Sequence, residues 1–164
     1  MHAHTDKAIQ DQGSVIGCYG CGPDNIHGLR LKSYWRGDIA IAHFIPQPFH
    51  CAGQPDIVYG GLLASLIDCH SCNFAIAHHY ALEKREIGSD PKIFCVTAQL
   101  NVSYRKPVMI DKPIELVARY HQGDGKTVTG RKVWVECDLS SGGHVCVTGE
   151  ALIIRVEPAS SKNC

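Results

Sequence analysis

The sequence predicts an α+β domain in which a curled antiparallel sheet of five to six strands surrounds one long central helix. Two short strand patterns precede a long apolar segment, and about four further strand patterns follow it. Strands joined by short turns favour antiparallel pairing, and a helix that is apolar on nearly all sides is normally enclosed by other structure. We therefore expect the helix to lie at the centre, with the strands wrapped around it.

The first two strands are expected at residues 29–35 and 39–45. Arg36, Gly37 and Asp38 separate them, and the glycine and aspartate suit the tight turn of a β-hairpin. Residues 46–55 follow with three prolines and a glycine, which predict an irregular loop leading to the helix.

The long helix is expected from about Gly60 to about Tyr80. At about 100° per residue, its small side chains gather on one face and its bulky side chains on the other. The small face consists of Gly61, Ala64, Ser65, Asp68, Cys72 and Ala75, and the bulky face of Leu63, Leu66, Ile67, His70 and Phe74. The bulky face can pack against a sheet, whereas the small face leaves room for a ligand or a second helix.

The C-terminal half contains further strand patterns at residues 94–104 and 114–121, and a long hairpin at 127–138 and 144–156. Residues 139–143, which end in two glycines, predict the turn of that hairpin. Apolar and polar residues alternate along the segment from Lys132 to Cys137, as expected for a sheet that is packed on one face.

Length and composition place these elements in one domain. The chain has 164 residues, of which 45% are hydrophobic, which is enough for a sizeable core. We expect residues 18–156 to form this domain, residues 1–17 a flexible N-terminal segment, and residues 157–164 a tail. Sixteen basic and sixteen acidic residues cancel, so no net field favours nucleic acid or an anionic membrane. No stretch of the sequence approaches the roughly 20 consecutive apolar residues of a membrane span, and we expect a cytosolic protein.

The nine cysteines are expected to be free thiols, because their number is odd and the core is large enough to fold without disulfides. Cys69 and Cys72 fall inside the expected helix, where small buried hydrophobes are the favoured interpretation. Cys18 and Cys21, with neighbouring glycines, resemble a metal-binding knuckle, yet no second pair completes four ligands. We therefore expect no metal, with zinc at Cys18 and Cys21 as the alternative.

Chemistry is most strongly indicated by Gly60, Gly61 and Asp68. Paired glycines let another molecule approach the backbone closely, and the first turn of a helix presents unpaired N–H groups at its positive end. Asp68 lies two turns further on among apolar residues, where a carboxylate is tolerated chiefly at sites of chemistry. The alternatives are a structural cap or buried ion pair for Asp68, and simple close packing for the glycines.

Several motifs together resemble the hotdog-fold thioesterases, in particular the phenylacetate-pathway and THEM4-like acyl-CoA thioesterases. They are the loop and glycine pair of residues 53–61 with Asp68, the strand end of residues 102–108, Gly130-Arg131, and the N-terminal element of residues 18–29. The resemblance covers most of residues 18–156. It implies a hotdog fold and an obligate homodimer, often paired into a homotetramer, with acyl-CoA bound and hydrolysed where the subunits meet.

The resemblance also implies roles for individual residues. Asp68 would act as nucleophile or general base, and the N–H of Gly60, joined by that of Gly61, would polarise the thioester carbonyl. Such preorganised donors supply about 3 kcal/mol each elsewhere. Gln54, in the loop before the helix, would position water. Tyr59 stands where the family has histidine, so its hydroxyl would hold substrate or water differently.

Substrate contacts are expected from the small face of the helix and from the basic residues at the end of the strand at residues 94–104. Ser65 and Cys72 lie on the small face of the helix, although Cys72 is also explained as a small packing residue. Arg105 and Lys106 could bind the phosphates of coenzyme A, and solvated charges at a strand end are the alternative.

The expected activity is hydrolysis of an acyl-CoA thioester to a free acid and CoA, without metal or redox cofactor. A non-catalytic protein that binds acyl-CoA is the chief alternative, which the missing histidine would suit. An acyl-CoA hydratase or dehydratase is a third. Aryl, short-chain and medium-chain acyl groups all remain admissible, because a pocket built by two chains sets the preference.

Overall fold

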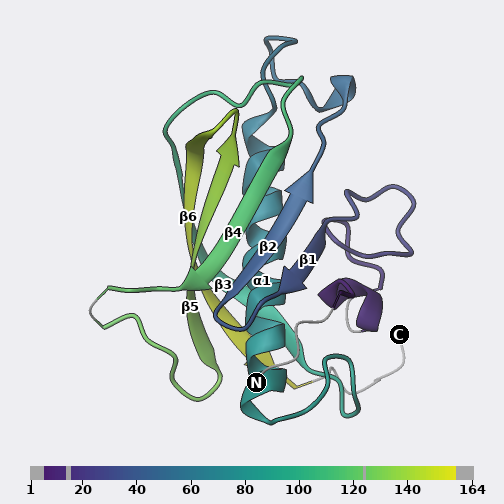
Figure 1. Ribbon diagram of the computed structural model, residues 1–164, viewed down its shortest axis with the longest axis vertical. Coiled ribbons are helices and arrows are strands. Elements are labelled where there is room, and N and C mark those ends of the chain that lie inside the picture. The colour runs from purple at the N-terminus through teal and green to yellow at the C-terminus, as the bar shows by residue number, and fades with distance from the viewer. Residues whose placement is uncertain (1–5, 14–15, 124, 158–164) are drawn as a thin grey trace.

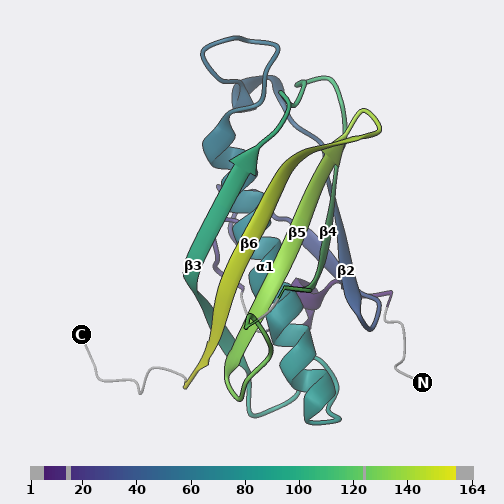
Figure 2. The same cartoon turned by 90° about the vertical axis from the view of Figure 1, so that its left-hand side faces the viewer.

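The computed structural model describes residues 6–13, 16–123 and 125–157. One long helix, α1 (Gly60–Leu82), lies along a six-stranded antiparallel sheet that curls around it (Figures 1 and 2). The predicted α+β hotdog arrangement is confirmed, with six strands. Residues 1–5 and all of the predicted tail (157–164) except residue 157 lie outside the described part of the chain.

The sheet has the strand order β1-β2-β4-β5-β6-β3. Its strands are β1 (Lys32–Trp35), β2 (Ile39–Phe44), β3 (Phe94–Tyr104), β4 (Ile114–Tyr120), β5 (Lys132–Ser141) and β6 (His144–Val156). Two short 3-10 helices, η1 (Ile9–Gln12) and η2 (Pro48–His50), precede the first strand and α1. β1 and β3 are therefore the edges of the sheet, and Figure 2 shows the long strand β3 at one side of it.

Two strand boundaries differ from the prediction because turns compete with strand pairing. Residues 29–31 are not in β1, since Leu29 and Leu31 donate backbone hydrogen bonds to Tyr19 (2.8 Å) and Gly20 (3.1 Å) in the N-terminal segment. β5 begins at Lys132, not at residue 127, because Thr129 and Lys132 exchange backbone hydrogen bonds around a turn.

The turn between β5 and β6 is also tighter than predicted. Only Gly142 and Gly143 adopt positive φ angles (+58° and +80°), so the turn needs these two residues alone. Leu139 to Ser141, which we expected in the turn, belong to β5 and pair with β6.

The faces of α1 follow the prediction closely. All five residues of the bulky face, Leu63, Leu66, Ile67, His70 and Phe74, are buried. On the small face, Ala75 is buried and the others are half-buried. Helix and sheet approach closely at Gly149 of β6, where an added Cβ would lie 2.3 Å from Cγ2 of Ile67. Glycine at this position lets the helix pack directly on the strand.

A buried hydrogen-bond chain joins η1, β1, α1 and β2. His70 Nε2 must donate to the carbonyl oxygen of Ala40 (3.0 Å), so its Nδ1 accepts from the Ser33 hydroxyl (2.8 Å). The Gln10 side chain donates to Ser33 Oγ and accepts from Ser33 N–H (3.0 and 2.9 Å). Burial lowers the pKa of His70 to about 4, which keeps the ring neutral.

This chain of contacts anchors part of the segment that we expected to be flexible. Ile9 and Gln10 are buried, and η1 contacts β1 and α1. Residues 9–12 are therefore an ordered part of the domain. Of the cysteines, the eight in the described residues are all free thiols, as predicted. No helix in this part of the chain is long and apolar enough to cross a membrane.

Candidate active site

The start of α1 presents unpaired amide groups. Leu62 and Leu63 both donate their N–H groups to the carbonyl of Tyr59 (3.1 and 3.3 Å), and these are the first hydrogen bonds of the helix. The N–H groups of Gly60 and Gly61 come before them and have no acceptor within the described residues. They are aligned with the positive end of the helix dipole and available to a ligand oxygen.

Two tyrosine rings explain why both positions are glycine. A Cβ at Gly61 would lie 2.4 Å from the ring of Tyr59, and a Cβ at Gly60 would touch the ring of Tyr104 at 3.4 Å. Tyr104 also donates its hydroxyl hydrogen bond to the carbonyl of Gly60 (2.8 Å). The glycine pair is thus held between two aromatic side chains, which fixes the direction in which its N–H groups point.

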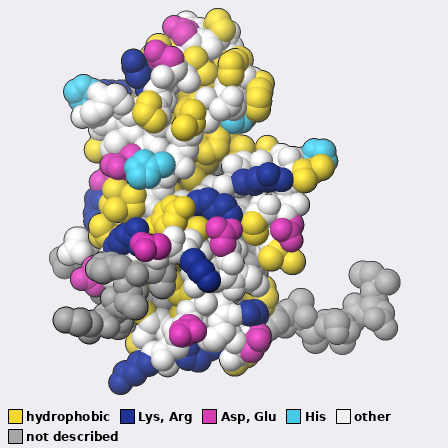
Figure 3. Space-filling view, turned by 45° about the vertical axis from the view of Figure 1, so that its right-hand side comes forward, with side chains coloured by type: hydrophobic (Ala, Val, Ile, Leu, Met, Phe, Trp, Pro, Cys, Tyr) yellow, Lys and Arg dark blue, Asp and Glu magenta, His cyan; other side chains and the backbone are white. Residues whose placement is uncertain are grey.

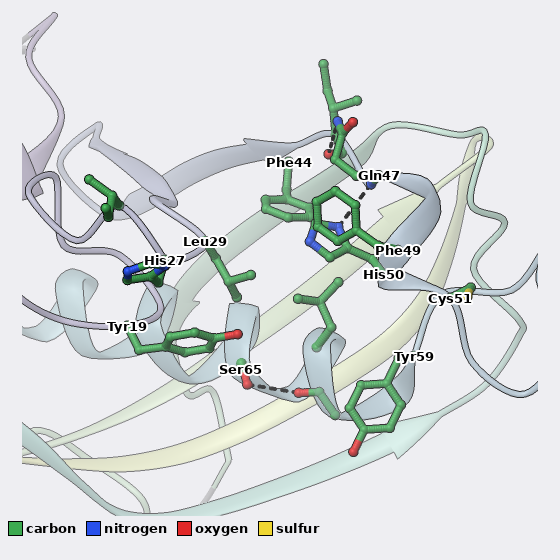
Figure 4. A pocket seen from close by; sticks show the side chains of 15 residues that line it. Tyr19, His27, Leu29, Phe44, Gln47, Phe49, His50, Cys51, Tyr59 and Ser65 are labelled. Carbon is green, nitrogen blue, oxygen red and sulfur yellow. Dashed lines mark hydrogen bonds between the residues drawn. The ribbon is translucent and has the colours of Figure 1, made fainter.

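A cavity of about 890 Å³ opens beside Gly61 (Figure 4). Its walls come from the N-terminal segment, from the end of β2 with the following loop, and from the first two turns of α1. The lining residues are Tyr19, Ile26, His27, Gly28, Leu29, Phe44, Ile45, Gln47, Phe49, His50, Cys51, Tyr59, Gly61, Leu62 and Ser65. Its volume falls within the range of small-molecule sites, about 300–1,000 Å³.

The lining combines aromatic and aliphatic side chains with the polar side chains of His27, Gln47, His50 and Ser65. Ser65 donates its hydroxyl to the carbonyl of Gly61 (2.9 Å), as Figure 4 shows. His50 lies between the rings of Phe44 and Phe49, and its Nδ1 accepts the N–H of Gln47 (3.0 Å). Burial lowers the pKa of His50, which favours the neutral ring. Such a lining suits an apolar group held next to a polarised carbonyl.

The rim of the cavity is apolar. Phe49 is 78% exposed and Tyr59 is 59% exposed, and Tyr19, Ile26 and Ile45 are exposed as well. In the view of Figure 3, hydrophobic side chains gather over the upper part of the molecule. Large exposed apolar groups around a pocket are typical of sites that bind a ligand or a second protein.

Asp68 lies outside this cavity. Its carboxylate is half-buried and accepts a hydrogen bond of 2.6 Å from the hydroxyl of Thr97 on β3. Thr97 stands next to a β-bulge in the pairing of β3 with β6, a feature that re-aims side chains. Eight residues of helix at 1.5 Å each separate Asp68 from Gly60 by about 12 Å. One chain alone therefore does not bring this carboxylate and these amides onto the same carbonyl.

The other predicted residues fall into separate places. Arg105 and Lys106 line a smaller cavity of about 330 Å³, which also includes Gly60. Cys72 donates its thiol to the carbonyl of Cys95 (3.3 Å), outside both cavities. Gln54 is exposed on the loop before α1, and its carbonyl accepts the N–H of Ile57.

Sequence reasoning missed the aromatic half of the cavity. Tyr19, Phe44, Phe49 and His50 come from two segments that meet only in the folded chain. The sequence predicts an irregular loop at residues 46–55, but it does not specify which side chains of that loop turn toward the cavity.

Known proteins with this architecture include thioesterases. A thioesterase superfamily protein from Shewanella loihica is 38% identical, with 82% of this chain and 98% of that chain covered and a TM-score of 0.61. The PaaI protein of the phenylacetic acid degradation operon of E. coli is 12% identical and covers 79% of this chain and 81% of its own, with a TM-score of 0.59, which shows a shared fold.

Among curated proteins, the mouse acyl-coenzyme A thioesterase THEM4 is 27% identical over 111 residues, or 66% of this chain. The chain spans 40% of the length of that protein. No family model matches the sequence.

The six-stranded sheet around one helix defines a hotdog-fold protein. On the likeness to the Shewanella protein, the chain belongs to the thioesterase superfamily.

Proposed function

We propose that the protein hydrolyses an acyl-CoA thioester to a free acid and CoA. The observation that carries this proposal is the pair of N–H groups at Gly60 and Gly61, which have no acceptor within the described residues, together with the cavity of about 890 Å³ that Gly61 lines. The amides would bind the thioester oxygen, and the acyl group would enter the cavity. Preorganised donors of this kind stabilise the negative charge that develops on the carbonyl oxygen.

The reacting carboxylate would come from a second copy of the chain. Within one chain the helix separates Asp68 from the amides by about 12 Å, so a shared substrate needs Asp68 of the partner subunit. β3 offers the surface for this assembly, because it is an edge strand of eleven residues with no further strand beside it in the described part of the chain, and Val96 on it is 48% exposed. Pairing β3 with its copy would satisfy its free backbone groups and place both Asp68 residues at the subunit boundary.

The chemistry then follows one of two routes. As general base, Asp68 would take a proton from water while the oxygen of that water bonds to the carbonyl carbon. The resulting oxyanion would be held by the two amides until the C–S bond breaks and the CoA thiolate gains the proton. As nucleophile, Asp68 would form a mixed anhydride and release CoA, after which water would cleave the anhydride.

Most of the remaining predicted residues are assigned to binding. Arg105 and Lys106 lie exposed where β3 ends, next to Gly60, and would pair with CoA phosphates. Ser65 would contact the acyl chain inside the cavity that it lines. Cys72 lies outside both cavities, and its thiol hydrogen bond to the carbonyl of Cys95 favours the alternative role of a small packing residue. Gln54, on the exposed loop, would position water in the partner's site. Tyr59, at the rim of the cavity, would hold the thioester by its ring and hydroxyl.

A panel of aryl-, short-chain and medium-chain CoA esters tests the proposal by thiol release. Asp68→Asn should lower kcat by about 10²–10⁴-fold with the fold intact. Asp111→Asn, which changes an exposed carboxylate on another loop, is the matched control and should leave kcat unchanged. Label found in Asp68 after a single turnover in ¹⁸O-water would identify the nucleophile route, with water opening the anhydride at the Asp68 carbonyl. Equal activity of wild type and Asp68→Asn would overturn the assignment.

One observation favours a second candidate, a protein that binds acyl-CoA without turnover. Tyr59 stands at the helix start in place of an imidazole, and its ring lies close to Gly61, 2.4 Å from where an added Cβ would be. Measurable affinity for acyl-CoA by calorimetry, with no thiol release from any ester in the panel, would support binding alone.

A further inference from the structure

Three thiols from two distant parts of the sequence meet at α1. The sulfur atoms of Cys18, Cys21 and Cys69 all lie within 4.8 Å of one another. Cys18 and Cys21 come from the N-terminal segment, whereas Cys69 comes from the middle of α1. The cluster is separate from the amides of Gly60 and Gly61, and the proposed hydrolysis does not use it.

The spacing fits a tetrahedral metal ion. Zinc–thiolate bonds of about 2.3 Å at tetrahedral angles place neighbouring sulfur atoms about 3.8 Å apart. The distance between the sulfur atoms of Cys18 and Cys69 is 3.8 Å. A disulfide would require about 2.05 Å and could join only two of the three thiols. One of the three sulfur–sulfur distances therefore matches a tetrahedral thiolate site, and the other two are at most 4.8 Å.

A buried amide is oriented toward one of the sulfur atoms. Asn73 donates through Nδ2 to the carbonyl of Cys69 (2.8 Å), and a carbonyl can only accept, so the orientation of this amide is fixed. The second hydrogen of Nδ2 then points to Sγ of Cys21 at 3.4 Å, which makes that sulfur an acceptor. Asn73 is 1% exposed. Donors to ligating atoms are the usual surroundings of bound metals.

The turn that carries Cys18 and Cys21 is shaped for this approach. A Cβ at Gly20 would lie 2.2 Å from Sγ of Cys69, and a Cβ at Gly22 would lie 2.4 Å from the backbone nitrogen of Cys18. Gly22 N–H bonds to the carbonyl of Cys18 (2.8 Å), which closes the turn. Both glycines are thus required for three sulfur atoms to converge.

We propose that Cys18, Cys21 and Cys69 bind one Zn²⁺ ion, which fastens the N-terminal segment to α1. Zn²⁺ prefers thiolate ligands in tetrahedral geometry, and water completes the fourth position. Tyr19, Gly28 and Leu29, which wall the large cavity, follow directly from this turn. The ion therefore holds one wall of the cavity in place while standing apart from the reacting groups.

Metal binding is measured on the full chain, stripped with a chelator under reducing conditions. Titration with Zn²⁺ against a chromophoric competitor should give one equivalent per chain, and Co²⁺ should produce a sulfur-to-metal charge-transfer band. Cys69→Ser should weaken Zn²⁺ binding by more than about 100-fold, and Asn73→Ala by about 10- to 100-fold, the usual effect of losing an outer partner. Cys51→Ser, a thiol outside the cluster, is the control and should keep one equivalent.

Hydrogen exchange provides a second readout that does not depend on activity. Removal of Zn²⁺ should increase exchange at residues 16–31 and leave β4 to β6 unchanged. Three outcomes would overturn the proposal: no stoichiometric binding by wild type, equal loss of metal in Cys51→Ser and Cys69→Ser, or a disulfide within the cluster in protein purified under reducing conditions. Each of these leaves the proposed hydrolysis untouched, since Asp68 and the amides are tested separately.

Discussion

The carboxylate of Asp68 and the hydroxyl of Thr97 are joined by a hydrogen bond of 2.6 Å. This contact connects the middle of α1 to the edge strand β3, beside the bulge in its pairing with β6. A short hydrogen bond to a carboxylate restricts its rotation, because one oxygen is engaged while the other is left for a ligand. Thr97 is therefore a positioning residue for the proposed base.

Replacement of Thr97 by valine should lower kcat and leave KM nearly unchanged. The hydrogen bond to a charged group is worth about 1.5–3 kcal/mol, equivalent to about 10- to 160-fold in rate if it acts in the transition state. Steady-state kinetics on the best ester of the panel measures the change. Thr97→Ser should recover most of the rate, and Ser103→Ala on the same strand should have no effect. A change confined to KM would contradict a positioning role.

A charge on the exposed edge of β3 should separate the subunits. Val96→Lys introduces a cation where two copies of the strand would meet, and lysine on an edge is a known barrier to strand pairing. Light scattering coupled to size exclusion should report half the wild-type mass, and hydrolysis should be lost with it. Val128→Lys, in the loop before β5, is the control. An unchanged mass for Val96→Lys would exclude β3 as the interface.

Stability should fall as the solution is acidified from neutral pH. The pKa of His70 is lowered from 6.5 to about 4 by burial, so between these values the unfolded chain binds a proton that the folded chain does not. The free energy of unfolding should therefore decrease by about 1.4 kcal/mol per pH unit in this window, up to about 3 kcal/mol in all. Burial lowers the pKa of His79 to about 4 as well, which adds in the same direction.

Urea unfolding at pH 7, 6 and 5 measures this dependence. His70→Gln removes one titrating group from the core, so its unfolding free energy should decline less steeply over the same range. If the two curves run parallel, His70 does not contribute to the acid sensitivity.

An alanine at Gly149 should destabilise the domain. The added Cβ would lie 2.3 Å from Ile67, a β-branched residue in the core with little freedom to move. Overpacking of this kind is expected to lower the free energy of unfolding by about 1–3 kcal/mol. Chemical denaturation gives the value, and Gly53→Ala, where no atom lies within 4 Å, should stay within about 0.5 kcal/mol of wild type. Equal stability of the two variants would show that the helix shifts to make room.

Local patterns predicted the fold well where one physical constraint dominates. β3 and β6 begin and end at the predicted residues, because long alternating segments leave few other pairings. The buried face of α1 was likewise readable from helical periodicity. The first residues of β1 and β5 were predicted wrongly. Backbone hydrogen bonds to Gly20 and around Gly130 replace strand pairing there, and the local pattern does not indicate them.

Features that depend on contacts between distant residues were harder to predict from the sequence. The glycine pair and its free amides could be located from the sequence, since they belong to one helix start. The sulfur atoms of Cys18 and Cys69 meet across 51 residues, and no local spacing indicates it. Tyr19 and His50 likewise line one cavity, although Tyr19 precedes β1 in the sequence and His50 follows β2. No local pattern predicts that they meet.

The walls of the large cavity come from residues 19–29, 44–51 and 59–65, while strands β3 to β6 contribute none of its lining. Substitutions in the first two of these segments can therefore change which ligands fit without changing the packing between α1 and strands β3 to β6. Chemical preference and thermodynamic robustness are encoded in different stretches of this polypeptide, so relatives can diverge in what they accept while keeping one scaffold.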